Sequence, residues 1–242
     1  MLVLALDTTT RQGSVALARD GGVLATYTGD AAVTHGERLP GDLMRVLDAQ
    51  RLRIADVDLF AVASGPGSFT GLRIGIASMQ GLALASGKPL AGISALDAIN
   101  DSVHSLSLVS EVAVWMEAGR GQVFSATYKD DGVFEGPLVD KPAEILARWR
   151  GRTLPEVFAG DGALAYRDLI RAAAPGARIV EPMPPLAPGI ARLAEMQVRQ
   201  HGPSAPDAIR PIYIRRSDAE LARDRKAGLK LGTAPNRSRA DL

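Results

Sequence analysis

The sequence predicts an α/β protein built on a mixed sheet, because apolar runs of strand length alternate with longer amphipathic stretches. The chain opens with an all-apolar run, Leu2–Leu6, which is typical of a buried strand. A threonine-rich turn separates this run from the alternating strand Ser14–Arg19, and a glycine pair then leads into a third strand at Val23–Thr28. An opening meander followed by helices favours a sheet with both antiparallel and parallel pairs.

Helices and buried strands alternate through the rest of the first hundred residues. A helix is predicted from about Glu37 to Arg51. Its apolar stripe consists of Leu39, Leu43, Val46 and Leu47. A second helix begins after the N-cap Ser68 and runs to Ser86, before Gly87. The remaining elements are the strands Leu59–Ser64 and Leu90–Ile93 and a helix that follows Ser94, from Ala95 to about Ser105.

The second half of the chain is less sharply patterned. Its predicted strands are Val112–Glu117, Gln122–Lys129, Val157–Ala159 and Ile212–Ile214, with a turn at Asp130-Asp131-Gly132. Its predicted helices begin at Pro142 and cover about Ala163–Ala174 and Ile190–His201. We expect a domain boundary near residue 105, which divides the chain into a lobe at 1–105, a smaller lobe at 106–215 and a polar basic tail at 216–242.

Composition restricts the chemistry. The 242 residues include no cysteine, which excludes disulfides, iron–sulfur clusters and a thiol nucleophile. The net charge of +1 is too even to predict binding to nucleic acid or membrane by bulk electrostatics, although residues 201–242 carry 9 basic and 5 acidic side chains. No apolar run approaches the roughly 18 residues of a membrane span. We therefore expect a cytoplasmic protein with no membrane partner.

The strongest local motif is GPGSFTGLRIG, which covers Gly65–Gly75. A glycine-rich turn between a buried strand and a helix presents backbone N–H groups to an anion, so Gly65 and Gly67 are candidate phosphate-binding residues. The spacing matches neither a Walker A loop nor the dinucleotide fingerprint. The alternative is a tight strand-to-helix turn that binds nothing.

A second candidate phosphate site is the turn Asp7-Thr8-Thr9-Thr10. Its hydroxyls and backbone amides could hold a phosphate, and the carboxylate of Asp7 could hold the accompanying magnesium. Equally, these side chains could satisfy the backbone of the hairpin itself. The residues leave both interpretations open.

Small residues form two stripes on the predicted helix at 68–86. One stripe contains Gly71, Gly75 and Ser78, and the other contains Ala77, Gly81 and Ala85. One stripe can be explained by packing on the protein's own sheet, but two faces suggest two neighbours. We therefore predict a helical interface with another protein. Its residues are Leu39, Leu43, Val46, Leu47, Gly71, Leu72, Gly75, Ser78 and Met79.

The usual catalytic patterns are missing from the sequence. The three histidines, His35, His104 and His201, are far apart, so no histidine pair has the i, i+4 spacing of a zinc site. No G-x-S-x-G elbow is present, and no carboxylates form an evident catalytic pair. We predict no catalytic residue and no metal ligand.

Several of these segments together resemble the bacterial tRNA threonylcarbamoyladenosine biosynthesis protein TsaB family, also called glycoprotease-like. The resemblance rests on Leu4–Leu17, the His35 helix, Gly65–Gly75 and Pro89–Ile99, and more loosely on Val112–Tyr128 and Pro211–Arg215. It implies the two-lobed fold of actin, sugar kinases and the Hsp70 ATPase, with a reduced second lobe.

The resemblance also implies a role. Members of this family pair with a catalytic homologue, TsaD, and with an ATPase, TsaE, to transfer a threonylcarbamoyl group to an adenosine beside the tRNA anticodon. The two metal-binding histidines of the catalytic homologue would fall at about Ala95 and Ile99, which cannot bind a metal. The resemblance thus implies a non-catalytic scaffold, homodimeric when alone, that meets tRNA through the complex.

The sequence departs from the family's pattern at two places, and it leaves two alternatives to the scaffold function. The turn Glu117-Ala118-Gly119-Arg120 differs from the family's usual Asp-Ala-Arg-Arg, and Arg216–Leu242 extends past the usual end, either as a solvated tail or as a tRNA contact. The scaffold interpretation needs no cofactor. An ATP-dependent phosphotransferase of the same fold would bind ATP or ADP with magnesium at Asp7. A protease is disfavoured because neither metal ligands nor a nucleophile–base pair is evident.

Overall fold

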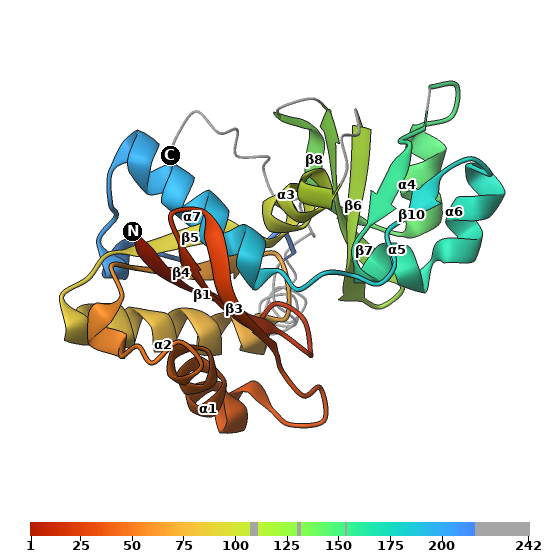
Figure 1. Ribbon diagram of the computed structural model, residues 1–242. Helices are drawn as coiled ribbons and strands as arrows, with labels where there is room; N and C mark the ends of the chain where they lie inside the picture. Colours follow the sequence, from red (N-terminus) through yellow and green to blue (C-terminus); the bar gives the residue numbers. More distant parts are fainter. Residues whose placement is uncertain (107–110, 130–131, 153, 216–242) are drawn as a thin grey trace, which may run out of the picture.

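The computed structural model describes residues 1–106, 111–129, 132–152 and 154–215, and it contains two five-stranded sheets (Figure 1). The first has the order β3-β2-β1-β4-β5 and the second the order β10-β9-β6-β7-β8. In the first sheet β1 pairs antiparallel with β2 and parallel with β4, as the opening meander predicts. Its strands are β1 (Leu2–Asp7), β2 (Ser14–Arg19), β3 (Gly22–Thr28), β4 (Leu59–Gly65) and β5 (Leu90–Ser94).

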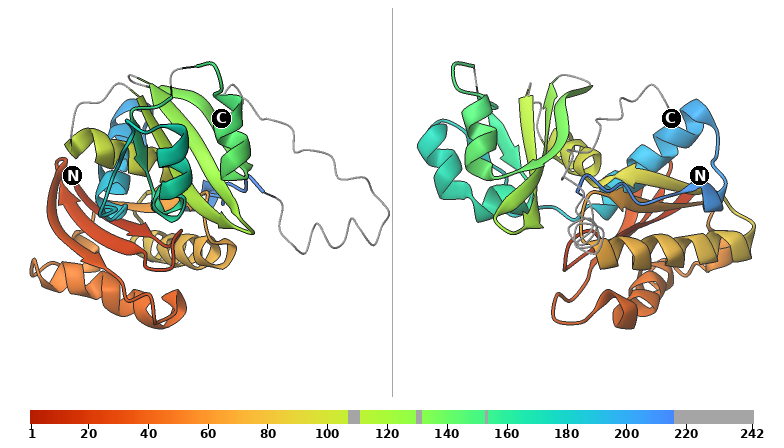
Figure 2. Two further views of the ribbon diagram at one scale, coloured as in Figure 1. Left: turned by 90° about the vertical axis from the view of Figure 1, so that its right-hand side faces the viewer. Right: turned by 180° about the vertical axis from the view of Figure 1, so that it is seen from behind.

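Helices cover both faces of the first sheet because the buried strand β1 is apolar on both sides. Leu2, Leu4 and Leu6 pack with α1 (His35–Asp48) and α2 (Phe69–Ser86) on one face. The alternate residues Val3 and Ala5 pack with α3 (Ala95–Leu106) and α7 (Ala187–His201) on the other face. Figures 1 and 2 show α1 and α2 together on one side of this sheet and α7 on the opposite side.

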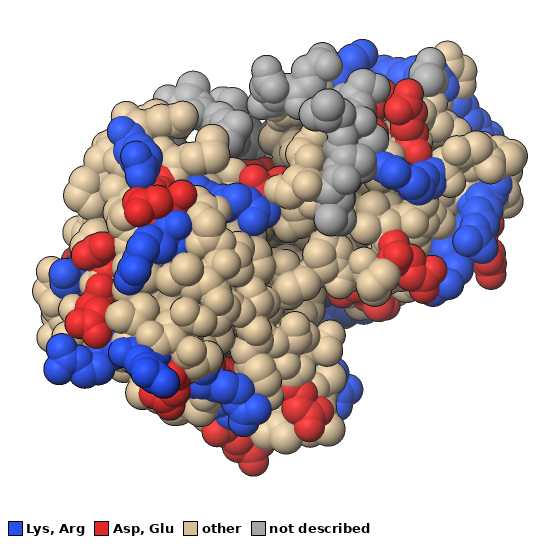
Figure 3. All heavy atoms as spheres, in the orientation of Figure 1, with Lys and Arg blue, Asp and Glu red and all other residues tan. Residues whose placement is uncertain are grey.

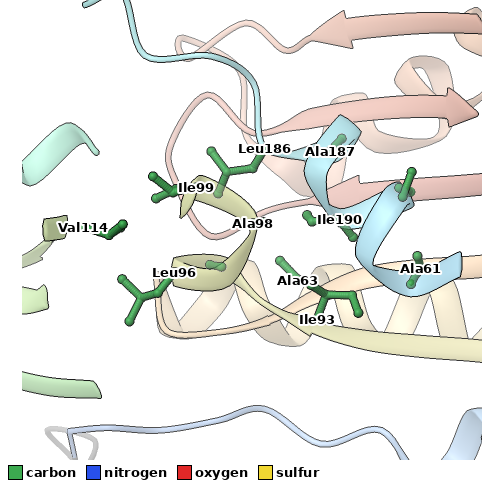
Figure 4. Packing of buried hydrophobic residues seen from close by; sticks show 14 of the residues in the cluster. Ala61, Ala63, Ile93, Leu96, Ala98, Ile99, Val114, Leu186, Ala187 and Ile190 are labelled. Carbon is green, nitrogen blue, oxygen red and sulfur yellow. The ribbon is translucent and has the colours of Figure 1, made fainter. Parts of the chain in front are cut away.

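The second sheet carries short helices and is joined to the first by a shared core. Its strands are β6 (Glu111–Gly119), β7 (Gln122–Lys129), β8 (Gly132–Asp140), β9 (Val157–Ala159) and β10 (Arg178–Ile179), and its helices are α4 (Pro142–Arg148), α5 (Asp161–Ala165) and α6 (Arg167–Ala173). Leu96 and Ile99 of α3 face Val114 of β6 within one apolar cluster (Figure 4). One apolar cluster therefore spans the two sheets, while each sheet has a further cluster of its own on its other face.

Local start and stop signals behave as predicted. The Ser68 hydroxyl accepts a hydrogen bond from Gly71 N at the start of α2, and Gly87 ends that helix at a φ of 62°. Pro142 is the first residue of α4, and the Ser94 hydroxyl accepts from Asp97 N at the start of α3. Pro40 lies in the second turn of α1, so one backbone hydrogen bond of that helix is missing.

Several expectations for the second half are wrong. Ile212–Ile214 is not a strand, although Ile212 N donates to Ser64 O at 2.7 Å. The helix expected at 163–174 is two short helices that meet at Tyr166. Neither β8 nor β10 was predicted. Glycine and proline interrupt the strand pattern of β8, and β10 is only two residues long. Most of the turn expected at 130–132 lies outside the described residues.

Helix α7 differs from the expected division of the chain. It falls within 106–215, which was assigned to the smaller lobe, yet it packs on β1 and β2 of the first sheet. Gly189 lets α7 also pack closely on α3, since a Cβ there would lie 2.6 Å from Ala98 O. After α7 the chain therefore runs back along the first lobe, where Gln80 of α2 donates to Pro206 O and Ile209 O.

Candidate functional site: a cavity between the two sheets

A cavity of about 490 Å³ lies between the sheets, where five segments from distant parts of the sequence meet. The first sheet contributes the β1–β2 turn and the β4–α2 turn. The second sheet contributes the β6–β7 turn and the start of α5, and the segment 212–215 completes the wall. The lining includes Thr9, Thr10, Gly67, Glu117 and Asp161. The sequence could not predict this junction, because it is formed only by long-range contacts.

The turn Asp7–Thr10 is held by hydrogen bonds within the chain. Asp7 Oδ1 accepts from Thr9 N at 2.7 Å and from Thr9 Oγ1 at 2.6 Å. Thr8 Oγ1 donates to Gly71 O at 2.8 Å, and Thr10 Oγ1 accepts from Gly13 N at 3.1 Å. All three threonine hydroxyls therefore satisfy the protein's own backbone or carboxylate, as the second of the two sequence interpretations expects.

Burial changes the acidity of Asp7. The side chain is buried, and the loss of hydration raises its pKa to about 6. The hydrogen bonds from Thr9 lower the pKa of Asp7, and so, to a smaller extent, does the positive charge of Arg38. The negative charge of the nearby Asp161 raises it further. Asp7 therefore changes its charge close to neutral pH.

The two glycines proposed to bind phosphate allow close packing of the chain on itself. A Cβ at Gly65, which has a φ of 125°, would lie 2.6 Å from Ile212 O. A Cβ at Gly67 would lie 2.5 Å from Thr9 Cβ. Because these glycines have no side chain, the segment around Ile212 and the turn Asp7–Thr10 can pack directly against them. Gly67 also lines the cavity, so its backbone remains available to a ligand there.

The predicted partner interface is mostly buried inside this chain, which corrects the prediction. Leu39, Leu43, Val46, Leu47, Leu72 and Met79 are at most 5% exposed. Gly71 and Gly75 are buried against the β1–β2 turn, where a Cβ would lie 2.1 Å from Thr8 O or 2.2 Å from Thr8 Oγ1. Ser78 is half-buried. Both the leucine stripe and this glycine stripe thus pack on the chain's own sheet.

The other small stripe of α2 faces outward. Ala77, Gly81 and Ala85 are exposed, and among the described residues no atom lies within 4 Å of a Cβ built at Gly81. Leu84 beside them is 60% exposed, and Met44 of α1 is 39% exposed. Sequence periodicity therefore identified two small faces, but the face predicted to meet a partner packs inside this chain and the other face is exposed.

Two carboxylates of the second lobe, Glu117 of β6 and Asp161 of α5, also line the cavity. Asp161 Oδ1 accepts from Glu117 N at 3.0 Å and from Gly162 N at 2.9 Å, while the Glu117 side chain is exposed. Burial raises the pKa of Asp161, and these backbone hydrogen bonds oppose the rise.

An aromatic pair at the cavity was missed by the sequence analysis. The ring centroids of Phe69 and Tyr213 are 5.1 Å apart, and both residues line the cavity. Arg73 lies over the Phe69 ring, with Cζ 3.9 Å from its centroid, and its Nε donates to Tyr213 Oη at 3.1 Å. An aromatic residue at the centre of the glycine motif was the only local sign, since Tyr213 is distant in sequence.

The positions that the resemblance assigns to metal-binding histidines are part of the core. Ala95 and Ile99 of α3 are at most 1% exposed. Across the described residues, no group of three or more histidine, cysteine, aspartate or glutamate side chains could hold a metal ion. Within those same ranges, no helix is long and apolar enough to cross a membrane. On the side viewed in Figure 3, basic and acidic side chains are interspersed.

Comparison with known proteins decides the family. The sequence matches the family described as TsaD, tRNA N6-adenosine threonylcarbamoyltransferase, over residues 7–222. The chain belongs to this family. The protein TsaB of Escherichia coli K12 is 30% identical, over 90% of this chain and 96% of that protein. TsaB of Bacillus subtilis is 28% identical, over 70% of this chain and 75% of that protein. The resemblance to TsaB is confirmed.

Solved structures confirm the fold class. A Pseudomonas aeruginosa protein described as similar to peptidase YEAZ aligns with a TM-score of 0.75 at 26% identity, covering 88% of this chain and 99% of that one. An activator of 2-hydroxyisocaproyl-CoA dehydratase from Clostridium difficile, solved with bound ADPNP, aligns with a TM-score of 0.50 at 12% identity, covering 88% of this chain and all of that one. This second likeness concerns the fold alone.

Proposed function

We propose that this chain is a cytoplasmic subunit of the machinery that forms threonylcarbamoyladenosine in tRNA, and that it supports a catalytic homologue without catalysing the transfer. Its relatives named TsaB carry this biosynthesis in their names. The observation that carries the non-catalytic role is the pair Ala95 and Ile99, which are buried apolar residues where the resemblance places metal-binding histidines. Neither side chain offers a ligand atom.

The expected partners are the catalytic homologue TsaD, the ATPase TsaE and, through their complex, tRNA. We assign the partner surface to the exposed face of α2, formed by Ala77, Gly81, Leu84 and Ala85, with Met44 of α1 on the same side of the sheet. Small residues let a partner helix approach closely, and Leu84 offers a side chain to bury. The same surface would serve a second copy when the chain is alone.

Introducing charge on this face is expected to weaken association with the catalytic homologue about 30-fold or more, the effect typical of a central interface residue. The substitutions are Gly81→Glu and Leu84→Glu, at positions where the free chain has room for the new side chain. The control is Leu169→Glu on α6, where a leucine is 37% exposed on the second lobe. Sedimentation or size-exclusion titration measures the association.

Equal binding by all three variants would contradict the assigned surface.

A separate reconstitution tests the function itself. The modification rate is measured with tRNA, threonylcarbamoyl-adenylate and the other subunits, in the presence and in the absence of this chain. We expect the modification rate to fall strongly without it. A full rate in its absence would contradict the supporting role.

A second candidate, an ATP-dependent phosphotransferase, is favoured by Asp7 and Asp161. These carboxylates come from different sheets and lie close enough for Asp161 to raise the pKa of Asp7. Such a pair could hold magnesium beside a phosphate. The threonine hydroxyls next to Asp7 are already engaged, which weakens this candidate. Titration calorimetry with Mg-ATP separates the two, because micromolar binding with turnover would favour the phosphotransferase and no heat would favour the scaffold.

A further inference from the structure

The proposed function does not use a group of three side chains that contact one another at the cavity, Phe69, Tyr213 and Arg73. The two rings contact each other, the guanidinium of Arg73 stacks on Phe69, and its Nε is hydrogen-bonded to the Tyr213 hydroxyl. Phe69 is 37% exposed and Tyr213 is 42% exposed. Large rings in such partly exposed positions offer a flat surface to a planar ligand.

The fold holds this group in place. Phe69 is the first residue of α2, directly after the N-cap Ser68. Ile212 N donates to Ser64 O, and the missing side chain at Gly65 admits Ile212 O. The segment that carries Tyr213 is thereby fixed beside the start of α2. The glycine motif therefore positions the aromatic surface.

The other walls of the cavity carry charges of both signs. Arg11 and Arg215 line it, and both are oriented by contacts of their own, Arg11 Nε to Ala31 O at 3.0 Å and Arg215 Nη1 to Gln122 Oε1 at 3.2 Å. Glu117 and Asp161 of the second lobe form an acidic wall, and Arg215 lies near it through Gln122, which pairs with Gly119. A ligand with a planar ring, amine donors and a nearby phosphate would match all of these groups. Its ring would stack on the aromatic side chains, its amines would donate to the carboxylates, and its phosphate would contact the arginines.

We propose that this cavity binds an unpaired nucleotide of an RNA strand, with its base stacked on Tyr213 and Phe69 and its phosphate beside Arg11 and Arg215. The inference rests on the proposed function, which brings tRNA to this chain. The acidic wall favours a strand nucleotide over a free triphosphate, because one phosphate at the edge carries a single charge while a triphosphate would bring several charges towards Glu117 and Asp161.

The test uses the full chain alone and a fluorescein-labelled hexariboadenylate, followed by fluorescence anisotropy. Tyr213→Ala and Phe69→Ala are each expected to weaken binding about tenfold, whereas Tyr213→Phe keeps the ring and binds within about twofold of the native chain. Arg11→Gln is expected to reduce the salt dependence of binding by about one phosphate contact. The matched control is Phe134→Ala on β8, where the ring is 59% exposed on an edge strand.

Two results would overturn the proposal. One is that Tyr213→Ala and Phe69→Ala bind the RNA as tightly as Phe134→Ala does. The other is that AMP or Mg-ATP displaces the RNA at the same nucleotide concentration as unlabelled hexariboadenylate, which would assign the cavity to free nucleotides. Every variant keeps residues 216–242, so their contribution is constant. Because no partner protein is present, failure here leaves the association test of the α2 face unaffected.

Discussion

Replacing Gly71 with alanine is expected to lower the free energy of unfolding by about 2–3 kcal/mol, the cost typical of forcing an extra methyl group into a packed site. The added Cβ would lie 2.1 Å from Thr8 O, a backbone atom that cannot move without shifting the β1–β2 turn. Thr8 Oγ1 also donates to Gly71 O, so the helix and the turn would have to separate together. Urea denaturation followed by circular dichroism measures the change.

Gly81→Ala is the matched control on the same helix. In the part of the chain that the structure describes, no atom lies within 4 Å of a Cβ at Gly81. Alanine there adds only its higher helix propensity and should raise the free energy of unfolding by up to about 1 kcal/mol. Opposite signs for the two variants would verify that one small stripe packs internally and the other does not. Two changes of the same sign would contradict this assignment.

Replacing Asp7 with asparagine is expected to stabilise the chain at pH 7.5 by about 2–3 kcal/mol, the free-energy equivalent of the difference between the two pKa values. The pKa of Asp7 rises from 3.8 to about 6 on folding, because burial disfavours the charged form. The folded chain thus binds more protons than the unfolded chain between these values. The contribution of Asp7 to native stability is therefore fully present below pH 4 and is lost as the pH rises through about 6.

Asparagine retains an oxygen that accepts the hydrogen bonds from Thr9 N and Thr9 Oγ1. The advantage of Asp7→Asn should accordingly shrink between pH 7.5 and pH 4, as measured by urea denaturation at several pH values. The control is Asp48→Asn at an exposed position of α1, which should follow the native pH profile. A constant difference between Asp7→Asn and the native chain would show that Asp7 titrates normally.

Sequence reasoning succeeded where the signal lies within a few residues. The apolar run at β1, the N-cap Ser68, the C-terminal Gly87 and the helix-opening Pro142 were predicted because hydrogen bonds and side-chain periodicity within one turn or strand define them. Strands β8 and β10 escaped prediction, because edge strands need little apolar patterning.

The two small faces of α2 show what periodicity cannot reveal. Small residues at helical spacing reveal that something approaches the helix closely, but not whether the neighbour is the same chain. Thr8 occupies the space above Gly71 and Gly75, whereas Gly81 faces open space. Only the position of the β1–β2 turn against α2 in the folded chain shows which small face is covered by the chain itself and which is not.

The sequence by itself determined the family, the alternation of strands and helices, and the absence of ligand atoms at Ala95 and Ile99, because each depends on residue identity at a known spacing. The tertiary structure alone decided which faces are buried, that Asp7 titrates near neutral pH, and that Tyr213 stacks on Phe69. These properties depend on which distant segments exclude water from one another. Contacts of that kind arise when the whole chain closes around a shared core, and they leave no local pattern.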